Sequence, residues 1–78
     1  MPTLPRELLE SYYDGRDLTL AETRVLRRLA HGLTAPEAAD ALGLSYHTVK
    51  KQVKTARAKL RANTTAHAVA IAVSLDLI

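Results

Sequence analysis

The sequence predicts an all-α fold: a four-helix domain preceded by a short extra helix or arm. Three observations carry this prediction. Apolar residues recur at helical spacing in most of the chain. Two capping signatures, Thr19–Glu22 (TLAE) and Thr34–Glu37 (TAPE), indicate where two helices begin. Gly32 and Gly43 follow those helices at the positions where a positive φ often ends one. We therefore divide the chain into an N-terminal arm, residues 1–17, and a domain, residues 18–78.

Composition limits the class of protein. The chain has 78 residues and neither cysteine, tryptophan nor phenylalanine, so disulfides, thiolate catalysis and cysteine-based zinc sites are excluded. No apolar run is long enough to predict a membrane span, and the N-terminus lacks the pattern of a secretory signal. We therefore expect a cytoplasmic protein. An alanine-rich core buries little area per residue, which favours further burial against a partner subunit.

The N-terminal elements follow from short patterns. Residues 4–13 predict a short helix whose apolar patch docks on the following domain or on a second subunit, and Asp14-Gly15 ends it. The next helix runs from its cap, Thr19, to about His31, with an apolar stripe that includes Val25 and Leu26. Glu22 lies at the angle of this stripe, where a carboxylate is unusual. We expect it to pair with a basic side chain of the later helix, Lys59 or Arg57.

A short helix then extends from Thr34 to about Leu42, and the Gly43 turn leads to the N-cap candidate Ser45. The long helix that follows, residues 45–61, has two different faces. One is an apolar stripe packed on the core, formed by Val49, Val53, Ala56 and Leu60. The opposite face carries His47, Lys50, Lys51, Lys54 and Arg61, with Arg57 at its edge.

Charge is distributed unevenly along the chain. Residues 1–40 hold five basic and seven acidic side chains, whereas residues 41–78 hold six basic and one acidic. Such a cationic face suits an anionic partner, and a short helix, a glycine turn and a basic helix together form a helix-turn-helix, whose second helix enters the DNA major groove. The predicted DNA-contacting residues are Ser45, His47, Thr48, Lys50, Lys51, Lys54, Thr55, Arg57 and Arg61.

The last predicted helix, residues 66–75, is apolar on nearly all sides. A terminal helix of a small domain buries only one face internally, so the other face must be exposed or meet a partner. We therefore predict a homodimer that binds an inverted-repeat DNA site. Its interface is expected at Ala66, Val69, Ala70 and Val73.

The order of these motifs resembles the LuxR-type (GerE-like) helix-turn-helix domain of bacterial regulators. The resemblance rests on LT-x-x-E at 18–22, VL at 25–26, GLT at 32–34, EAA at 37–39, LGLS at 42–45, TVK at 48–50, KL at 59–60 and AVA near the C-terminus. It implies four helices, a recognition helix in the major groove and dimerisation through the last helix. It also implies that Lys50, Lys51 and Lys54 contact bases and that Thr48 contacts phosphate.

The chain departs from that pattern at three positions. Gln52 stands where the family often has histidine, Thr65 where an arginine is common, and Ala38 where a larger apolar residue is usual. Full-length members usually carry a further N-terminal domain, whereas here 17 residues precede the resemblance. This favours a stand-alone member, bacterial or phage-encoded, controlled by its expression level or by a partner.

Other functions remain open at this stage. The domain could be the DNA-reading fourth region of a sigma factor, or an adaptor or a phage-type excision or immunity factor that binds DNA together with a protein partner. An enzyme is disfavoured, because His31, His47 and His67 lie in three separate segments without metal-ligand spacing or a nearby acid pair. We therefore expect no catalytic residue, metal or cofactor.

Overall fold

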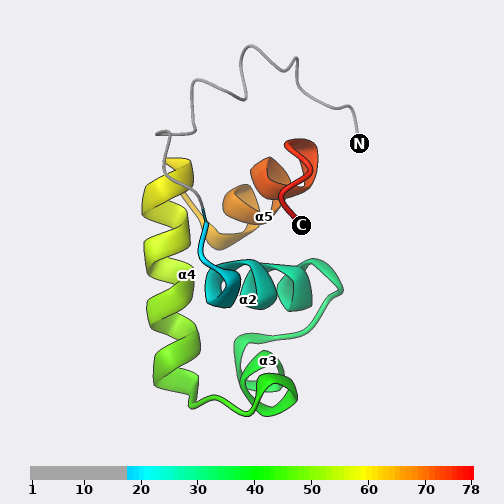
Figure 1. Cartoon of the computed structure of the whole chain (residues 1–78), viewed down its shortest axis with the longest axis vertical. Helices are drawn as coiled ribbons and strands as arrows, with labels where there is room; N and C mark the ends of the chain where they lie inside the picture. The colour runs from blue at the N-terminus through cyan, green and yellow to red at the C-terminus, as the bar shows by residue number, and fades with distance from the viewer. Residues whose placement is uncertain (1–17) are drawn as a thin grey trace.

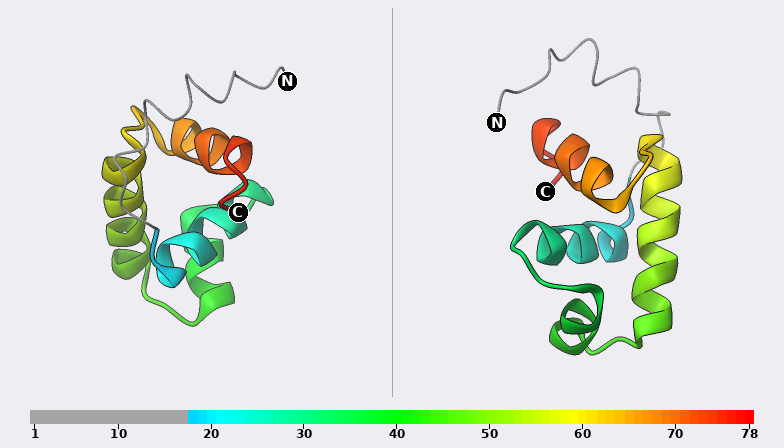
Figure 2. Two further views of the ribbon diagram at one scale, coloured as in Figure 1. Left: turned by 45° about the horizontal axis from the view of Figure 1, so that its top comes forward. Right: turned by 180° about the vertical axis from the view of Figure 1, so that it is seen from behind.

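The computed structural model describes residues 18–78, which form four α-helices and no strand (Figure 1). These are α2 (Leu20–Ala30), α3 (Ala35–Leu42), α4 (Tyr46–Leu60) and α5 (Thr65–Ser74). The longest helix, α4, lies along one side of the domain, and α3, α2 and α5 pack beside it in that order from one end to the other (Figures 1 and 2). The helix predicted at residues 4–13 lies outside the described residues.

Local sequence determines where α2 and α3 begin. The Thr19 hydroxyl accepts the Glu22 backbone N–H at 3.1 Å, and the Glu22 carboxylate accepts the Thr19 N–H at 2.7 Å. Thr34 and Glu37 repeat this reciprocal pair at 3.3 and 2.8 Å. Each box satisfies two amides that the first turn of a helix leaves without partners. Both predicted capping boxes are therefore confirmed.

Two helices end on residues in the left-handed conformation. Gly43 has φ of 67° at the end of α3, as the predicted turn into α4 requires. Arg61 ends α4 with φ of 53°, although a side chain makes this conformation costly. The N–H of the next residue, Ala62, donates to the Arg57 carbonyl at 2.9 Å, which completes the last turn of α4.

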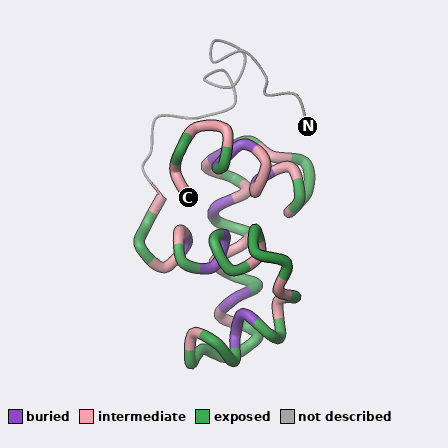
Figure 3. Tube along the Cα trace, turned by 90° about the vertical axis from the view of Figure 1, so that its right-hand side faces the viewer, coloured by how far each residue is buried: buried purple, intermediate pink, exposed green. Residues whose placement is uncertain are grey.

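Two core clusters meet along α4. The first joins α2, α4 and α5 and comprises Leu26, Ala56, Leu60, Ala68, Ile71 and Ala72. The second joins α2, α3 and α4 and comprises Val25, Ala38, Ala39 and Val49. The apolar stripe predicted for α4 is thus confirmed, with Val53 only partly buried at its edge. Purple buried segments and green exposed ones alternate along each helix in Figure 3, so one face of each helix carries the core.

Within residues 18–78, no helix is both long and apolar enough to cross a membrane.

Candidate nucleic-acid interface

The N-terminus of α4 begins the candidate interface. The Ser45 hydroxyl accepts the Thr48 backbone N–H at 3.1 Å and donates to the Thr48 hydroxyl at 2.9 Å. This confirms Ser45 as the N-cap. The first turn of α4 holds no acidic residue, and Ser45, Tyr46 and His47 are exposed. Helix N-termini carry a partial positive charge, so this end of α4 suits a phosphate.

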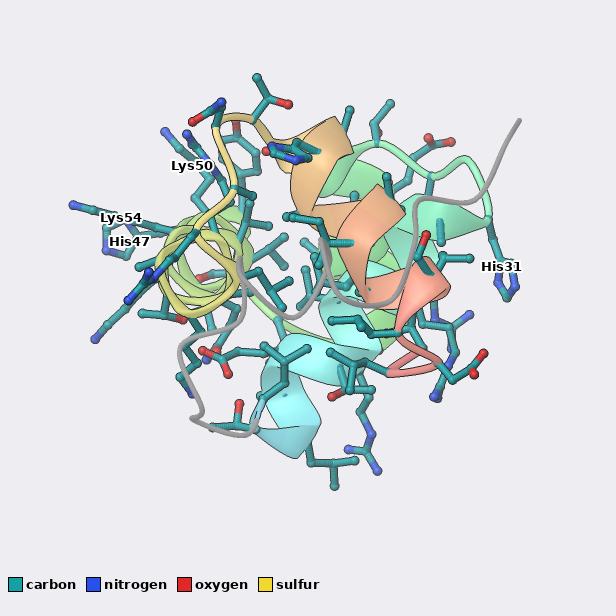
Figure 4. The ribbon with its side chains drawn as sticks, turned by 90° about the horizontal axis from the view of Figure 1, so that it is seen from above. His31, His47, Lys50 and Lys54 are labelled. Carbon is teal, nitrogen blue, oxygen red and sulfur yellow. The ribbon has the colours of Figure 1, made fainter. Side chains whose placement is uncertain are left out.

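A cationic face continues along α4. Lys50, Lys51 and Lys54 are all exposed, and Figure 4 shows His47, Lys50 and Lys54 pointing away from the domain on the same side. The Lys50 ammonium lies 5.3 Å from the centroid of the Tyr46 ring, within the range of a cation–π contact. This contact limits the positions that the Lys50 head group can take.

A groove of about 830 Å³ runs beside this face. The partly buried apolar side chains of Leu29, Ala35 and Val53 lie in it, contributed by α2, α3 and α4. We call these three residues the apolar floor. The remaining lining residues are Tyr46, His47, Lys50, Lys51, Lys54, Arg57 and Thr65. Among residues 18–78, no acidic side chain lines the groove.

Arg57 belongs to this groove, but its guanidinium also holds the turn between α4 and α5. Its Nη2 donates to the Asn63 carbonyl at 2.8 Å, while its buried Nε has no hydrogen-bond partner among the described residues. The Asn63 N–H in turn donates to Nδ1 of His67 at 3.1 Å. His67 itself is half-buried in this turn.

Thr55 and Lys59 of α4 both contact the Glu22 carboxylate of α2. Thr55 donates its hydroxyl to Oε2 of Glu22, and Lys59 Nζ lies 2.7 Å from Oε1 of the same carboxylate. The expected ion pair between Glu22 and α4 is thus confirmed, with Lys59 as the partner. The Thr55 hydroxyl, which we predicted to contact DNA, is bound to Glu22 in this structure.

Burial and these contacts have opposite effects on the pKa of the Glu22 carboxyl. Glu22 is only 2% exposed, and burial alone would raise its pKa. The hydrogen bonds from Lys59, Thr55 and the Thr19 backbone outweigh burial and hold the pKa below its usual value. The ionised carboxylate therefore holds α4 against the first turn of α2. The same contacts fix the orientation of the cationic face.

The structure brings only part of the predicted set together. His47, Lys50, Lys51, Lys54 and Arg57 line one groove. Ser45 and Thr48 lie at the start of α4, and Arg61 lies exposed at its other end. Tyr46 is not among the predicted residues, although its position four residues before Lys50 indicates a contact on one helical face. Leu29 and Ala35, which reach the groove from other helices, are also absent from the predicted set.

The predicted dimer face of α5 differs from the face that enters the core. Ala68, Ile71 and Ala72 are buried in the domain. Val73 is 51% exposed and Ala66 is also exposed, whereas Val69 and Ala70 are half-buried. The helix itself begins at Thr65 and ends at Ser74, one residue earlier at each end than predicted.

A short helix, a glycine turn and a longer helix with an exposed cationic face define a helix-turn-helix domain. Residues 16–72 match the GerE family, described as bacterial regulatory proteins, luxR family. The match covers well over half of the chain, and the protein belongs to this family of DNA-binding regulatory domains, which is not an enzyme class. Comparisons with curated proteins and with solved structures find no match.

Proposed function

We propose that the domain is a sequence-specific transcriptional regulator that binds double-stranded DNA as a homodimer, with α4 in the major groove. The observation that carries this proposal is the cationic face of α4. Its three lysines are exposed and make no ion pair with any residue between 18 and 78. A solvated structural helix would gain from acidic partners one turn away, whereas α4 contains none.

The polar groups of α4 divide into two roles. Ser45, Thr48 and the first amides of α4 bind phosphates, as do Arg57 and Arg61, and this gives an affinity that falls with salt. Lys50, Lys51, Lys54 and His47 lie further along the exposed face and contact base edges. Lysine favours the O6 and N7 acceptors of guanine, and a good base contact contributes about 1–3 kcal/mol of discrimination.

Dimerisation through α5 completes the proposed mechanism. Exposed Val73 and Ala66, with half-buried Val69 and Ala70, leave an apolar face beside the core-facing side of the helix. Their small side chains allow two α5 helices to approach closely. A two-fold dimer then presents two copies of α4 to an inverted repeat whose half-sites lie about one DNA turn apart.

The test is a double substitution with a matched control. Lys50→Ala combined with Lys54→Ala removes two base contacts, so affinity for a selected duplex, measured by fluorescence anisotropy, falls about 30-fold or more. Arg24→Ala with Arg27→Ala removes the same charge from exposed residues of α2 and leaves α4 intact. The control variant keeps most of the affinity. Equal losses in both variants, or a loss of far-UV helicity with the lysine pair, would contradict the assignment.

A further inference from the structure

The groove beside α4 has a composition that DNA phosphates do not explain. Phosphates need the cations, but they make no use of the apolar floor, Leu29, Ala35 and Val53. Burial of apolar surface stabilises a complex in proportion to area. A ligand that uses the whole groove therefore combines acidic groups with apolar side chains, as an acidic amphipathic peptide does.

The chain itself contains such a peptide. Residues 1–17 lie outside the described residues, and in sequence they hold four acidic and two basic side chains. Their charge is therefore opposite to that of the groove. The apolar residues of this segment are Leu4, Leu8, Leu9, Tyr12 and Tyr13, and its acids are Glu7, Glu10, Asp14 and Asp17.

The segment is also long enough to reach the groove. It joins the domain at Leu18, immediately before α2. Seventeen residues span at most about 60 Å when extended, and the longest dimension of the structure is 36 Å. Because the segment is covalently attached, its effective concentration at the groove is on the order of millimolar, so weak contacts suffice.

We propose that residues 1–17 bind in the groove beside α4 and compete with DNA for Lys50 and Lys54. The binding itself stands on the charge and apolar character of the groove, whereas the competition rests on the function proposed above. The apparent DNA affinity is then the intrinsic affinity multiplied by the fraction of molecules in which the groove is free. A groove covered about nine-tenths of the time weakens DNA binding about tenfold.

The location of the segment is tested without DNA. Because the chain has no cysteine, Ser11→Cys carries a single nitroxide label at a defined position. The label is expected to broaden the methyl NMR signals of Leu29, Ala35 and Val53. Stronger broadening at Ala41, which lies beside the arginines of α2, or at Val73 of α5 than at these three residues would place the segment elsewhere and overturn the proposal. The absence of broadening would also overturn it.

The competition is tested with two variants of equal charge. Glu7→Gln with Glu10→Gln, and Asp40→Asn with Asp76→Asn, each raise the net charge by two, but only the first pair lies in the segment. We expect the first variant to bind a labelled random-sequence duplex about tenfold more tightly at low salt, with a gain that shrinks as salt rises. The second should gain less than about twofold.

The outcomes separate the two proposals. Equal gains in both variants would assign the effect to net charge and overturn the competition. If neither the parent nor the variants bind duplex DNA while the nitroxide still broadens the groove, the proposed function fails and the docking stands.

Discussion

Glu22 provides the strongest test of how α4 is held against the rest of the domain. Its carboxylate is 2% exposed and accepts hydrogen bonds from Lys59, Thr55 and the Thr19 backbone. Glu22→Gln keeps the shape of the side chain but removes its charge, which breaks the buried ion pair with Lys59 Nζ. The side chain of Lys59 is 16% exposed, so water compensates only in part.

The size of the effect follows from that geometry. Removing one partner of a fully buried ion pair costs about 3–5 kcal/mol, and the partial exposure of Lys59 brings the expected cost below most of that range. We expect Glu22→Gln to lower the free energy of unfolding by about 2–3 kcal/mol at pH 7. The assay is urea unfolding followed by far-UV circular dichroism at one protein concentration. Glu37→Gln is the matched control, since that glutamate is exposed and caps α3 without an ion pair to any described residue.

The pH dependence of this difference has a definite sign. The pKa of Glu22 is lowered in the folded protein, so the stability that its charge contributes is complete above the unfolded pKa and is lost as pH falls through the folded pKa. The deficit of Glu22→Gln should therefore be largest near neutral pH and shrink in acid. Adding Lys59→Met should restore part of the stability, because both charges are then removed. A loss below about 0.5 kcal/mol, or one that is independent of pH, would refute this account of Glu22.

Three further outcomes follow from the helix ends and from α5. Arg61→Gly should stabilise the fold by about 0.5–1 kcal/mol in urea unfolding, because glycine adopts the left-handed φ of 53° without strain. The same change should lower the salt slope of DNA binding by about 1, because one phosphate contact is lost. A destabilised variant would contradict the first expectation. Gly43→Ala should cost about 1 kcal/mol, because its φ is 67° although open space surrounds the new methyl. Val73→Glu should give a folded monomer by sedimentation equilibrium; an unchanged dimer would exclude this face as the interface.

Much of the fold could be predicted from the sequence because its determinants are local. The capping boxes at Thr19 and Thr34 bind residues only three positions away, and the stripe of α4 follows from the helical repeat. The pairing of Glu22 with Lys59 could also be expected, since a carboxylate on an apolar face needs a basic partner.

The features that sequence analysis missed depend on how helices cross. Thr55 and Arg57 lie at the edges of the cationic face, and a helical wheel does not say which neighbour each one meets. Thr55 meets Glu22 of α2, and Arg57 meets the Asn63 carbonyl before α5. The left-handed conformation of Arg61 could not be predicted, because the position is not a glycine.

The groove beside α4 was missed for the same reason. Leu29 and Ala35 come from α2 and α3, so their approach to Val53 depends on tertiary packing and not on sequence spacing.

The central claim, that α4 reads DNA sequence as part of a dimer, is tested most directly by selection of the full chain against random duplex DNA, with sequencing at two salt concentrations. The account predicts enrichment of an inverted repeat with half-sites about one helical turn apart, retained at the higher salt as non-specific binding weakens. Salt-sensitive binding without an enriched sequence would contradict it, because α4 would then hold only phosphates.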